Sequence, residues 1–294
     1  MRLDKTRPLS LVHIGKCGGS TIKSELLKTG KPRMLELASS VYHAVRPCCM
    51  HNDYHIVAIR NPIHRFVSAF YHVYSTLLLC RTKEPKCSAL VKNHLNIFNR
   101  YQTANKLAED LYDAEGNLNS VADFLITRND LPSVDRIVTY NPTFGIPYRV
   151  ETVIRKGLDE DWPPEKGMLI QKWTLFNTIN EEDAGSQHMD NHLGMNISWC
   201  LKYVLARDPQ SIVGVITTEH MAEDMKRLFS VEITTHKNKH TQRGNWGSQY
   251  DANLSVLAKT NLRRYLAKDY ECLLKLKDLD LITDEYYNYC MEKP

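Results

Sequence analysis

The sequence has no long apolar run, and this absence limits where the protein works. No stretch approaches the roughly 20 consecutive apolar residues that a membrane-spanning helix needs. The longest candidate, residues 66–80, is interrupted by polar residues such as His72. Residues 1–10 are polar, and the apolar run after them is too short for the hydrophobic part of a secretory signal. We therefore expect a cytoplasmic protein with no membrane partner.

The sequence also has little excess charge. It contains 38 Lys and Arg residues against 34 Asp and Glu residues, a formal net charge of +4 with neutral histidines. A nucleic-acid-binding chain usually carries a basic stripe, so we expect no nucleic-acid partner. The mild excess suits a pocket for one polyanionic small molecule. Because there is no internal repeat and 294 residues fit one α/β domain, we expect a single domain over residues 1–294.

Cysteine is present eight times, an even number that would suit disulfides in a secreted chain. Without a secretory signal, reduced thiols are the better expectation. Cys80 and Cys87, which bracket a short polar loop, are the pair that spacing favours. The run CCMHNDYH at residues 48–55 has no second pair at zinc-ligand spacing, so we expect no metal.

Apolar runs alternate with amphipathic segments along the chain. The pattern predicts strands at residues 10–14, 39–45, 54–60 and 211–219. It predicts helices at residues 20–28, from Pro62 onward, through most of 81–135, at 220–229, and as one helix or a pair at 254–279. Strands that alternate with helices are typical of a parallel α/β sheet. Residues 136–200, rich in Pro, Gly and aromatic residues, are expected to form functional loops and helices.

A glycine turn follows the first predicted strand, in the stretch LVHIGKCGGSTIKSELL at residues 11–27. A strand that leads through such a turn into a helix directs backbone N–H groups and the positive helix end at one point. Gly18 and Gly19 allow close approach of an anion, and Lys16 adds a mobile cation. The nucleotide-binding pattern G-x-x-x-x-G-K-[ST] is absent, because the lysine precedes the paired glycines. The stretch therefore predicts an anion site of another kind.

A second motif, IRNPIHRFVSAFYH, occupies residues 59–72. Arg60 comes just after a buried strand, where ligands bind in open α/β sheets. Ser68 lies two turns into the following helix, so the two side chains are candidates to grip one phosphate, the arginine bidentately. Arg65 is a weaker third candidate. The alternative is a helix-capping arginine with a solvent-facing serine.

The two motifs together resemble the sulfotransferases that use 3′-phosphoadenosine 5′-phosphosulfate (PAPS). The closest resemblance is to the branch with carbohydrate O-sulfotransferases and many bacterial sulfotransferases. It is strong over residues 11–71, and it extends thinly through YQTANKLA, VGVITTEHMAEDMKRL and YLAKDYECLL. Gly15 stands where the family usually has proline. The resemblance implies a P-loop-NTPase-like three-layer fold, with a central, mainly parallel sheet flanked by helices.

The resemblance also implies which residues hold the donor. The phosphosulfate would be bound by Lys16, Cys17, Gly18, Gly19, Ser20 and Thr21, and the 3′-phosphate by Arg60 and Ser68. Lys16 would also neutralise charge on the bridging oxygen as the sulfuryl group leaves. Sulfotransferases often close over the nucleotide with a late basic loop, and residues 236–247 are similar to it through Lys237, Lys239 and Arg243. A solvated run of charge is the alternative there, and no metal is implied.

A general base is needed to take the acceptor's proton, and histidine suits this role near neutral pH. In the resembled family the base often follows the strand after the first helix, and His43 fits that place best. His51 is the next candidate, and Glu36 would serve in a variant mechanism. His13 and His55 lie inside predicted strands, where core histidines are more common. A structural role remains the alternative for His43.

These residues predict transfer of a sulfuryl group from PAPS to a hydroxyl or amine of a small-molecule acceptor, such as a natural product. Adenosine 3′,5′-bisphosphate is the other product. Residues 136–200 would shape the acceptor pocket. A carbohydrate or glycolipid acceptor is the first alternative. A nucleotide-dependent kinase and a nucleotide-binding protein without catalysis are the others.

Overall fold

A computed structural model of the chain describes residues 9–39, 41–43, 54–83, 98–119, 134–139, 149–154, 174–175, 193–194, 196–234 and 253–292. Its centre is a four-stranded parallel sheet in the order β2-β1-β3-β7. The strands are β1 (Leu9–His13), β2 (Val41–His43), β3 (Tyr54–Ile59) and β7 (Ile212–Thr217). All four predicted strands are confirmed. Every residue of β3 is buried, as expected for a parallel strand covered on both faces.

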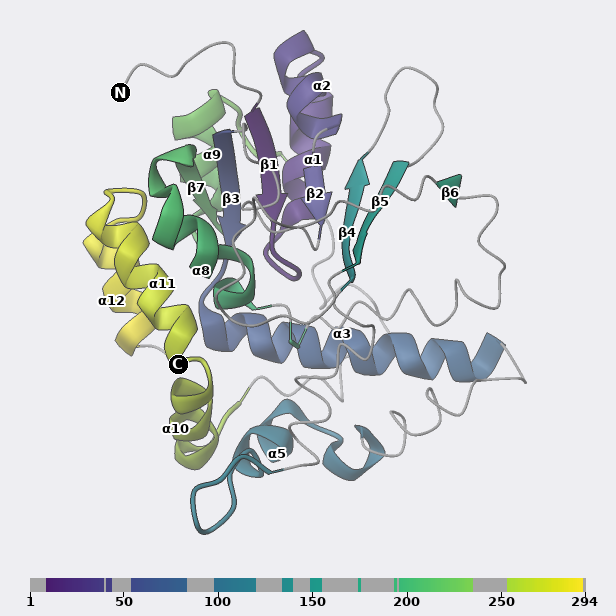
Figure 1. Cartoon of the computed structure of the whole chain (residues 1–294), viewed down its shortest axis with the longest axis vertical. Coiled ribbons are helices and arrows are strands. Elements are labelled where there is room, and N and C mark those ends of the chain that lie inside the picture. The colour runs from purple at the N-terminus through teal and green to yellow at the C-terminus, as the bar shows by residue number, and fades with distance from the viewer. Residues whose placement is uncertain are drawn as a thin grey trace.

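Helices flank this sheet, so the chain has an α/β fold (Figure 1). The crossover from β1 to β2 passes through α1 (Gly19–Lys28) and α2 (Pro32–Ser39). Two further helices, α8 (Ile197–Arg207) and α9 (Met221–Phe229), lie before and after β7 in the chain. A short 3-10 turn, η4 (Pro209–Ser211), joins α8 to β7. The predicted helices at 20–28 and 220–229 are therefore confirmed.

The helix predicted from Pro62 is α3 (Pro62–Lys83). Asn61 caps it, because its Oδ1 accepts the backbone N–H groups of Ile63 at 3.0 Å and His64 at 3.2 Å. Pro62 suits the first helical position because the missing N–H has no helical partner there. Figure 1 shows α3 crossing below the lower ends of the strands, with α5 (Ala104–Glu109) beneath it. Arg60 and Asn61 are therefore the only residues between the end of β3 and the start of α3.

The C-terminal part is entirely helical over residues 256–292 apart from its short joints. The predicted pair at 254–279 is present as α10 (Val256–Tyr265) and α11 (Ala267–Asp278). A third helix that the sequence did not indicate, α12 (Asp284–Glu292), follows them. In Figure 1 α11 lies between α8 and α12, and α10 lies near α5. Thus α10 and α5 pack together although about 150 residues separate them.

The expectation for residues 136–200 was partly wrong. A second sheet with antiparallel order β4-β5-β6 is formed there by β4 (Val134–Thr139), β5 (Arg149–Ile154) and β6 (Thr174–Leu175). The sequences VDRIVT and RVETVI are rich in β-branched residues, which favour strands. The Pro, Gly and aromatic content of the surrounding region obscured this signal. Because β4 begins at Val134, the last two residues of the predicted helical stretch 81–135 belong to a strand.

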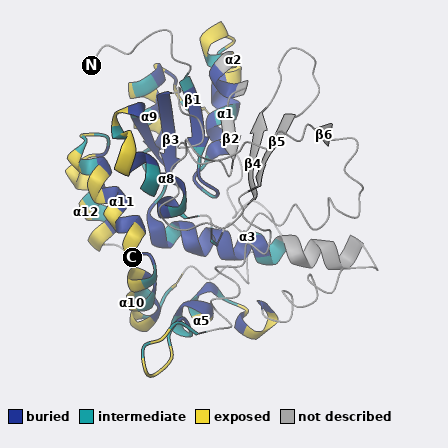
Figure 2. Ribbon diagram, in the orientation of Figure 1, coloured by how far each residue is buried: buried dark blue, intermediate teal, exposed yellow. Residues whose placement is uncertain are grey.

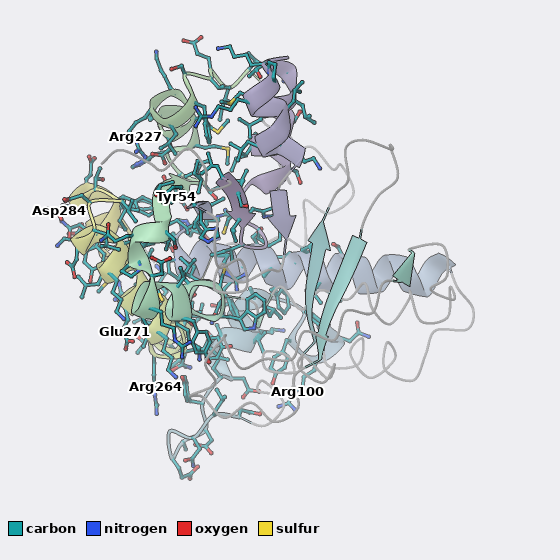
Figure 3. The ribbon with its side chains drawn as sticks, turned by 45° about the horizontal axis from the view of Figure 1, so that its top comes forward. Tyr54, Arg100, Arg227, Arg264, Glu271 and Asp284 are labelled. Carbon is teal, nitrogen blue, oxygen red and sulfur yellow. The ribbon has the colours of Figure 1, made fainter. Side chains whose placement is uncertain are left out.

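The core lies between the parallel sheet and its helices, where Figure 2 shows the darkest ribbon. Leu11, Val57, Ile59, Phe66 and Phe70 are among its fully buried or almost fully buried side chains. Charged side chains of the outer helices, such as Arg227, Glu271 and Asp284, lie around the periphery in Figure 3. Across the residues described above, we find no helix with the length and apolar character to cross a membrane.

Four cysteines have described side chains, and all four are buried free thiols: Cys17, Cys200, Cys272 and Cys290. Burial raises the pKa of Cys272 to about 12, so this thiol is neutral at physiological pH. The side chains of Cys80 and Cys87 lie outside the described part of the structure, and their pairing stays a prediction.

Candidate functional site

The strand order itself indicates where a ligand binds. From β1 the chain crosses to β2 on one side, whereas β3 pairs with the other side of β1. The strand order therefore reverses between β1 and β3. In open α/β sheets, ligands bind at such a switch point, in the crevice outside the carboxyl ends of the strands. Both sequence motifs follow these two strands, so the structure brings them to the same edge.

Backbone hydrogen bonds hold the three segments at this edge side by side. The N–H of Ile14, just after β1, donates to the carbonyl of Ala58 in β3 at 3.4 Å. The N–H of Thr218, just after β7, donates to the carbonyl of Ile59 at 2.9 Å. The glycine turn, Arg60 and residues 218–220 are therefore neighbours, although about 200 residues of sequence separate the first from the last.

The glycine turn has the backbone shape of an anion-binding loop. Lys16 has a φ of 71° and Gly18 a φ of 78°, while Cys17 between them has no positive φ. Backbone conformations that alternate in hand make successive N–H groups converge into an anion-binding concavity. Gly18 is the N-cap of α1 and provides no side-chain cap. The N–H groups of Gly19 and Ser20 therefore have no carbonyl within the helix to bond, and they are available to an anion.

Both glycines are needed for contacts within the protein as well. A Cβ at Gly18 would overlap the terminal methyl of Met221, at the start of α9. A Cβ at Gly19 would overlap the ring of His13, the last residue of β1. The sequence suggested close approach to a ligand as the reason for these glycines. The structure adds that the turn is packed tightly between β1 and α9.

Cys17 contributes to the shape of the turn. Its side chain is fully buried, its Sγ lies 3.8 Å from the carbonyl oxygen of Gly15, and its N–H donates to Ile14 at 3.1 Å. Burial raises the pKa of the Cys17 thiol to about 12, although the charges of Arg65 and Arg60 oppose this effect. The thiol therefore points into the core as a neutral group. Of the hydroxyl residues next in the chain, Ser20 is exposed and Thr21 is buried.

Arg60, the first residue after β3, forms an ion pair with Glu219. The Nε of Arg60 lies 3.8 Å from Oε1 of Glu219, and the arginine side chain remains 26% exposed. The carboxylate is itself fixed, because it accepts the N–H of Asn61 at 3.2 Å and the hydroxyl of Tyr286 at 3.0 Å. The contact is an ion pair without a hydrogen bond, and part of the guanidinium remains exposed. This arrangement suits bidentate binding of a phosphate.

Glu219 was missed as a functional residue by the sequence reasoning. Burial acts to raise its pKa, but the hydrogen bond with His64, the charge of Arg60 and the N–H of Asn61 outweigh it. The pKa of Glu219 is therefore below its ordinary value of 4.5. The available signal was its place two residues after the end of the strand β7. That place puts it at the same sheet edge as Arg60.

The other two candidates on α3 are buried. Ser68 is 2% exposed, so its hydroxyl is almost closed to solvent, and Arg60 is the better supported phosphate ligand. Arg65 is 0% exposed. Its Nη1 donates to the carbonyl of Gly15 and its Nη2 to the carbonyl of Leu193, both at 3.3 Å. Arg65 thus contacts the glycine turn from the core side and does not reach the surface.

The candidate bases are placed only in part. His43 is the last residue of β2 and pairs in register with His13, so its backbone lies at the carboxyl edge, level with the start of the glycine turn. Glu36 lies within α2. His55 is 1% exposed within β3, as expected for a core histidine. His51, Lys237, Lys239 and Arg243 lie outside the described residues, and their roles stay predictions.

Comparison with protein-family models, with curated proteins and with solved structures found no match for this chain. The candidate site therefore rests on its own geometry. Within the residues that the structure covers, no three His, Cys, Asp or Glu side chains gather as metal ligands do. The run at residues 48–53 lies outside that part. The described site combines the lysine Lys16, converging N–H groups and the arginine Arg60, an arrangement that suits two anionic groups on one ligand.

Proposed function

We propose that the chain is a PAPS-dependent sulfotransferase with a P-loop-like, three-layer α/β fold. The observation that supports this proposal is the position of the Lys16 turn beside Arg60 at the β1/β3 switch point. PAPS carries anionic groups at its 5′ and 3′ ends, and these two cationic positions match them. Lys16, Gly18, Gly19 and Ser20 would bind the phosphosulfate, and Arg60, held by Glu219, would bind the 3′-phosphate.

In the proposed reaction the acceptor oxygen or nitrogen attacks sulfur in line. The S–O bond to the phosphate breaks, and its electron pair leaves with adenosine 3′,5′-bisphosphate. The acceptor's proton passes to a general base, for which His43 is the first candidate and His51 the second. Lys16 and the N–H groups of the turn stabilise negative charge on the departing oxygen. The acceptor is a small molecule with a hydroxyl or amine, and a carbohydrate or glycolipid is the alternative.

A thermal-shift comparison of nucleotides tests this proposal. Adenosine 3′,5′-bisphosphate should raise the melting temperature, because a ligand at a hundredfold excess over Kd stabilises the native state by about 2.7 kcal/mol. ATP with Mg²⁺ should give no comparable shift. A shift with ATP and none with the bisphosphate would favour a kinase and refute the proposal.

The variant Arg60→Met gives the test its specificity. It should weaken binding of the bisphosphate while leaving adenosine 5′-monophosphate unaffected, since only the former has a 3′-phosphate. The matched control is Arg100→Met, which removes an exposed arginine paired with Asp110 at 3.2 Å, outside the proposed site. Equal weakening of both nucleotides by Arg60→Met would show that Arg60 does not bind the 3′-phosphate.

A further inference from the structure

Arg65 is an unusual residue because its charged side chain is completely buried, in the first turn of α3. Removing a guanidinium from water costs several kcal/mol unless its N–H groups are bonded and its charge is balanced. A fully buried arginine is not placed to bind a phosphate at the surface, so phosphate binding does not explain why Arg65 is charged. Its contacts therefore indicate its role.

Two terminal nitrogens of Arg65 bond to backbone carbonyls from distant parts of the chain. Nη1 donates to Gly15, in the turn after β1, and Nη2 donates to Leu193, just before α8. Asp269 of α11 is also fully buried; the charge of Arg65 acts to lower the pKa of this carboxyl group, but burial outweighs it and the pKa lies above its ordinary value of 3.8. Asp269 in turn accepts the N–H groups of Ile197 at 3.2 Å and Ser198 at 2.8 Å, at the start of α8. The carbonyls of Gly15 and Leu193 thus hold the guanidinium in place.

The bond to Gly15 determines the direction of the next N–H group. The peptide between Gly15 and Lys16 is trans and planar, so its C=O and N–H point in opposite directions. Because Arg65 draws the carbonyl toward the core, the N–H of Lys16 points away from the core. A charged donor on the carbonyl also polarises the peptide and strengthens its N–H as a donor. Lys16 itself has a positive φ, a conformation that a neighbouring contact must maintain.

We propose that Arg65 is a positioning residue of the donor site. Its buried guanidinium holds the Gly15 carbonyl inward and thereby directs the Lys16 N–H at the 5′-phosphate end of the nucleotide. The inference rests on the proposed function, and it assigns Arg65 to the 5′ end although its motif was matched to the 3′-phosphate. Arg60 and Arg65, five residues apart, therefore serve opposite ends of one ligand.

The test measures how much the 5′-phosphate adds to affinity. Kd values for adenosine 3′,5′-bisphosphate and adenosine 3′-monophosphate are determined by calorimetry. The Kd of the 3′-monophosphate divided by the Kd of the bisphosphate is the ratio that is compared between variants. The double variant Arg65→Met/Asp269→Asn removes the guanidinium without leaving an unpaired buried carboxylate. The control is Asp269→Asn alone, which keeps Arg65 on Gly15 and retains an oxygen for the start of α8.

We expect the double variant to lower the ratio at least tenfold relative to Asp269→Asn, while its affinity for the 3′-monophosphate stays within twofold. A ratio equal to that of the control would overturn the inference, because a purely structural Arg65 weakens both nucleotides equally or only lowers the melting temperature. If the double variant does not fold, Arg65→Lys is judged by the same ratio, since a lysine keeps the charge but does not bridge both carbonyls. If the native chain binds neither nucleotide, the proposed function itself fails.

Discussion

The left-handed backbone of Lys16 makes a quantitative prediction about stability and activity. A residue with a Cβ pays about 1–2 kcal/mol to occupy this conformation, and Lys16 has a φ of 71°. Glycine avoids that cost, but its greater freedom in the unfolded chain lowers the free energy of unfolding by about 0.5–1 kcal/mol. Lys16→Gly should therefore be more stable than Lys16→Ala by about 0.5–1 kcal/mol.

The comparison of these two variants isolates the backbone. Both lose the contacts of the lysine side chain beyond Cβ, so the difference between them reflects the cost of a Cβ at this φ less the greater freedom of glycine in the unfolded chain. The expected difference corresponds to about 2 °C in melting temperature for a chain of this size. Calorimetry or urea unfolding of the two variants, side by side, measures it.

Activity should respond in a different way. Both variants lack the ammonium group, so the proposed sulfuryl transfer should fall about a hundredfold or more in each, as catalysis does in enzymes when one stabilising donor is removed. Lys16→Gly would then be the more stable of two equally inactive variants, as expected where backbone strain is held at a functional site. If Lys16→Ala proved as stable as Lys16→Gly, the left-handed turn would be refuted, and the anion-binding shape of the loop with it.

Two further predictions concern the surroundings of the site and the core. Because the pKa of Glu219 lies below 4.5, the native state binds fewer protons than the unfolded state near that pH. Stability should therefore fall as the pH drops from about 5 through the folded pKa; Glu219→Gln should flatten this fall in urea unfolding, whereas the exposed control Glu232→Gln should not. Phe70 is fully buried, with its ring centroid 5.1 Å from that of Phe98, so Phe70→Ala should cost about 3–5 kcal/mol in denaturant unfolding. The same measurement on Leu257→Ala, where the residue is 55% exposed, should stay within about 0.5 kcal/mol, and a similar loss in both would contradict the assigned core.

Much of the parallel sheet could be predicted from the sequence because its signals are local. Continuous apolar runs mark buried strands, and Gly18 and Pro62 mark the starts of α1 and α3 within one or two residues. The second sheet was not predicted, because its strands pair across connections of about nine or more residues and lie in a region whose Pro, Gly and aromatic content is typical of loops. The helix α12 was also not indicated, yet the hydroxyl of its Tyr286 donates to the carboxylate of Glu219, which forms an ion pair with Arg60.

The sequence by itself determined which segments carry the candidate chemistry. The lysine-glycine turn and Arg60 each follow an apolar run that forms a strand from local preference, and residues that end parallel strands lie at one edge. Only the tertiary structure decided which of the two neighbouring arginines is exposed and which is buried. Arg60 and Arg65 are alike in sequence, but burial and hydrogen bonding separate them: Arg60 stays partly exposed beside Glu219, and Arg65 is enclosed behind the turn. The order of the strands and the packing of α3, α8 and α11 set that difference, and both arise from contacts between residues far apart in the chain.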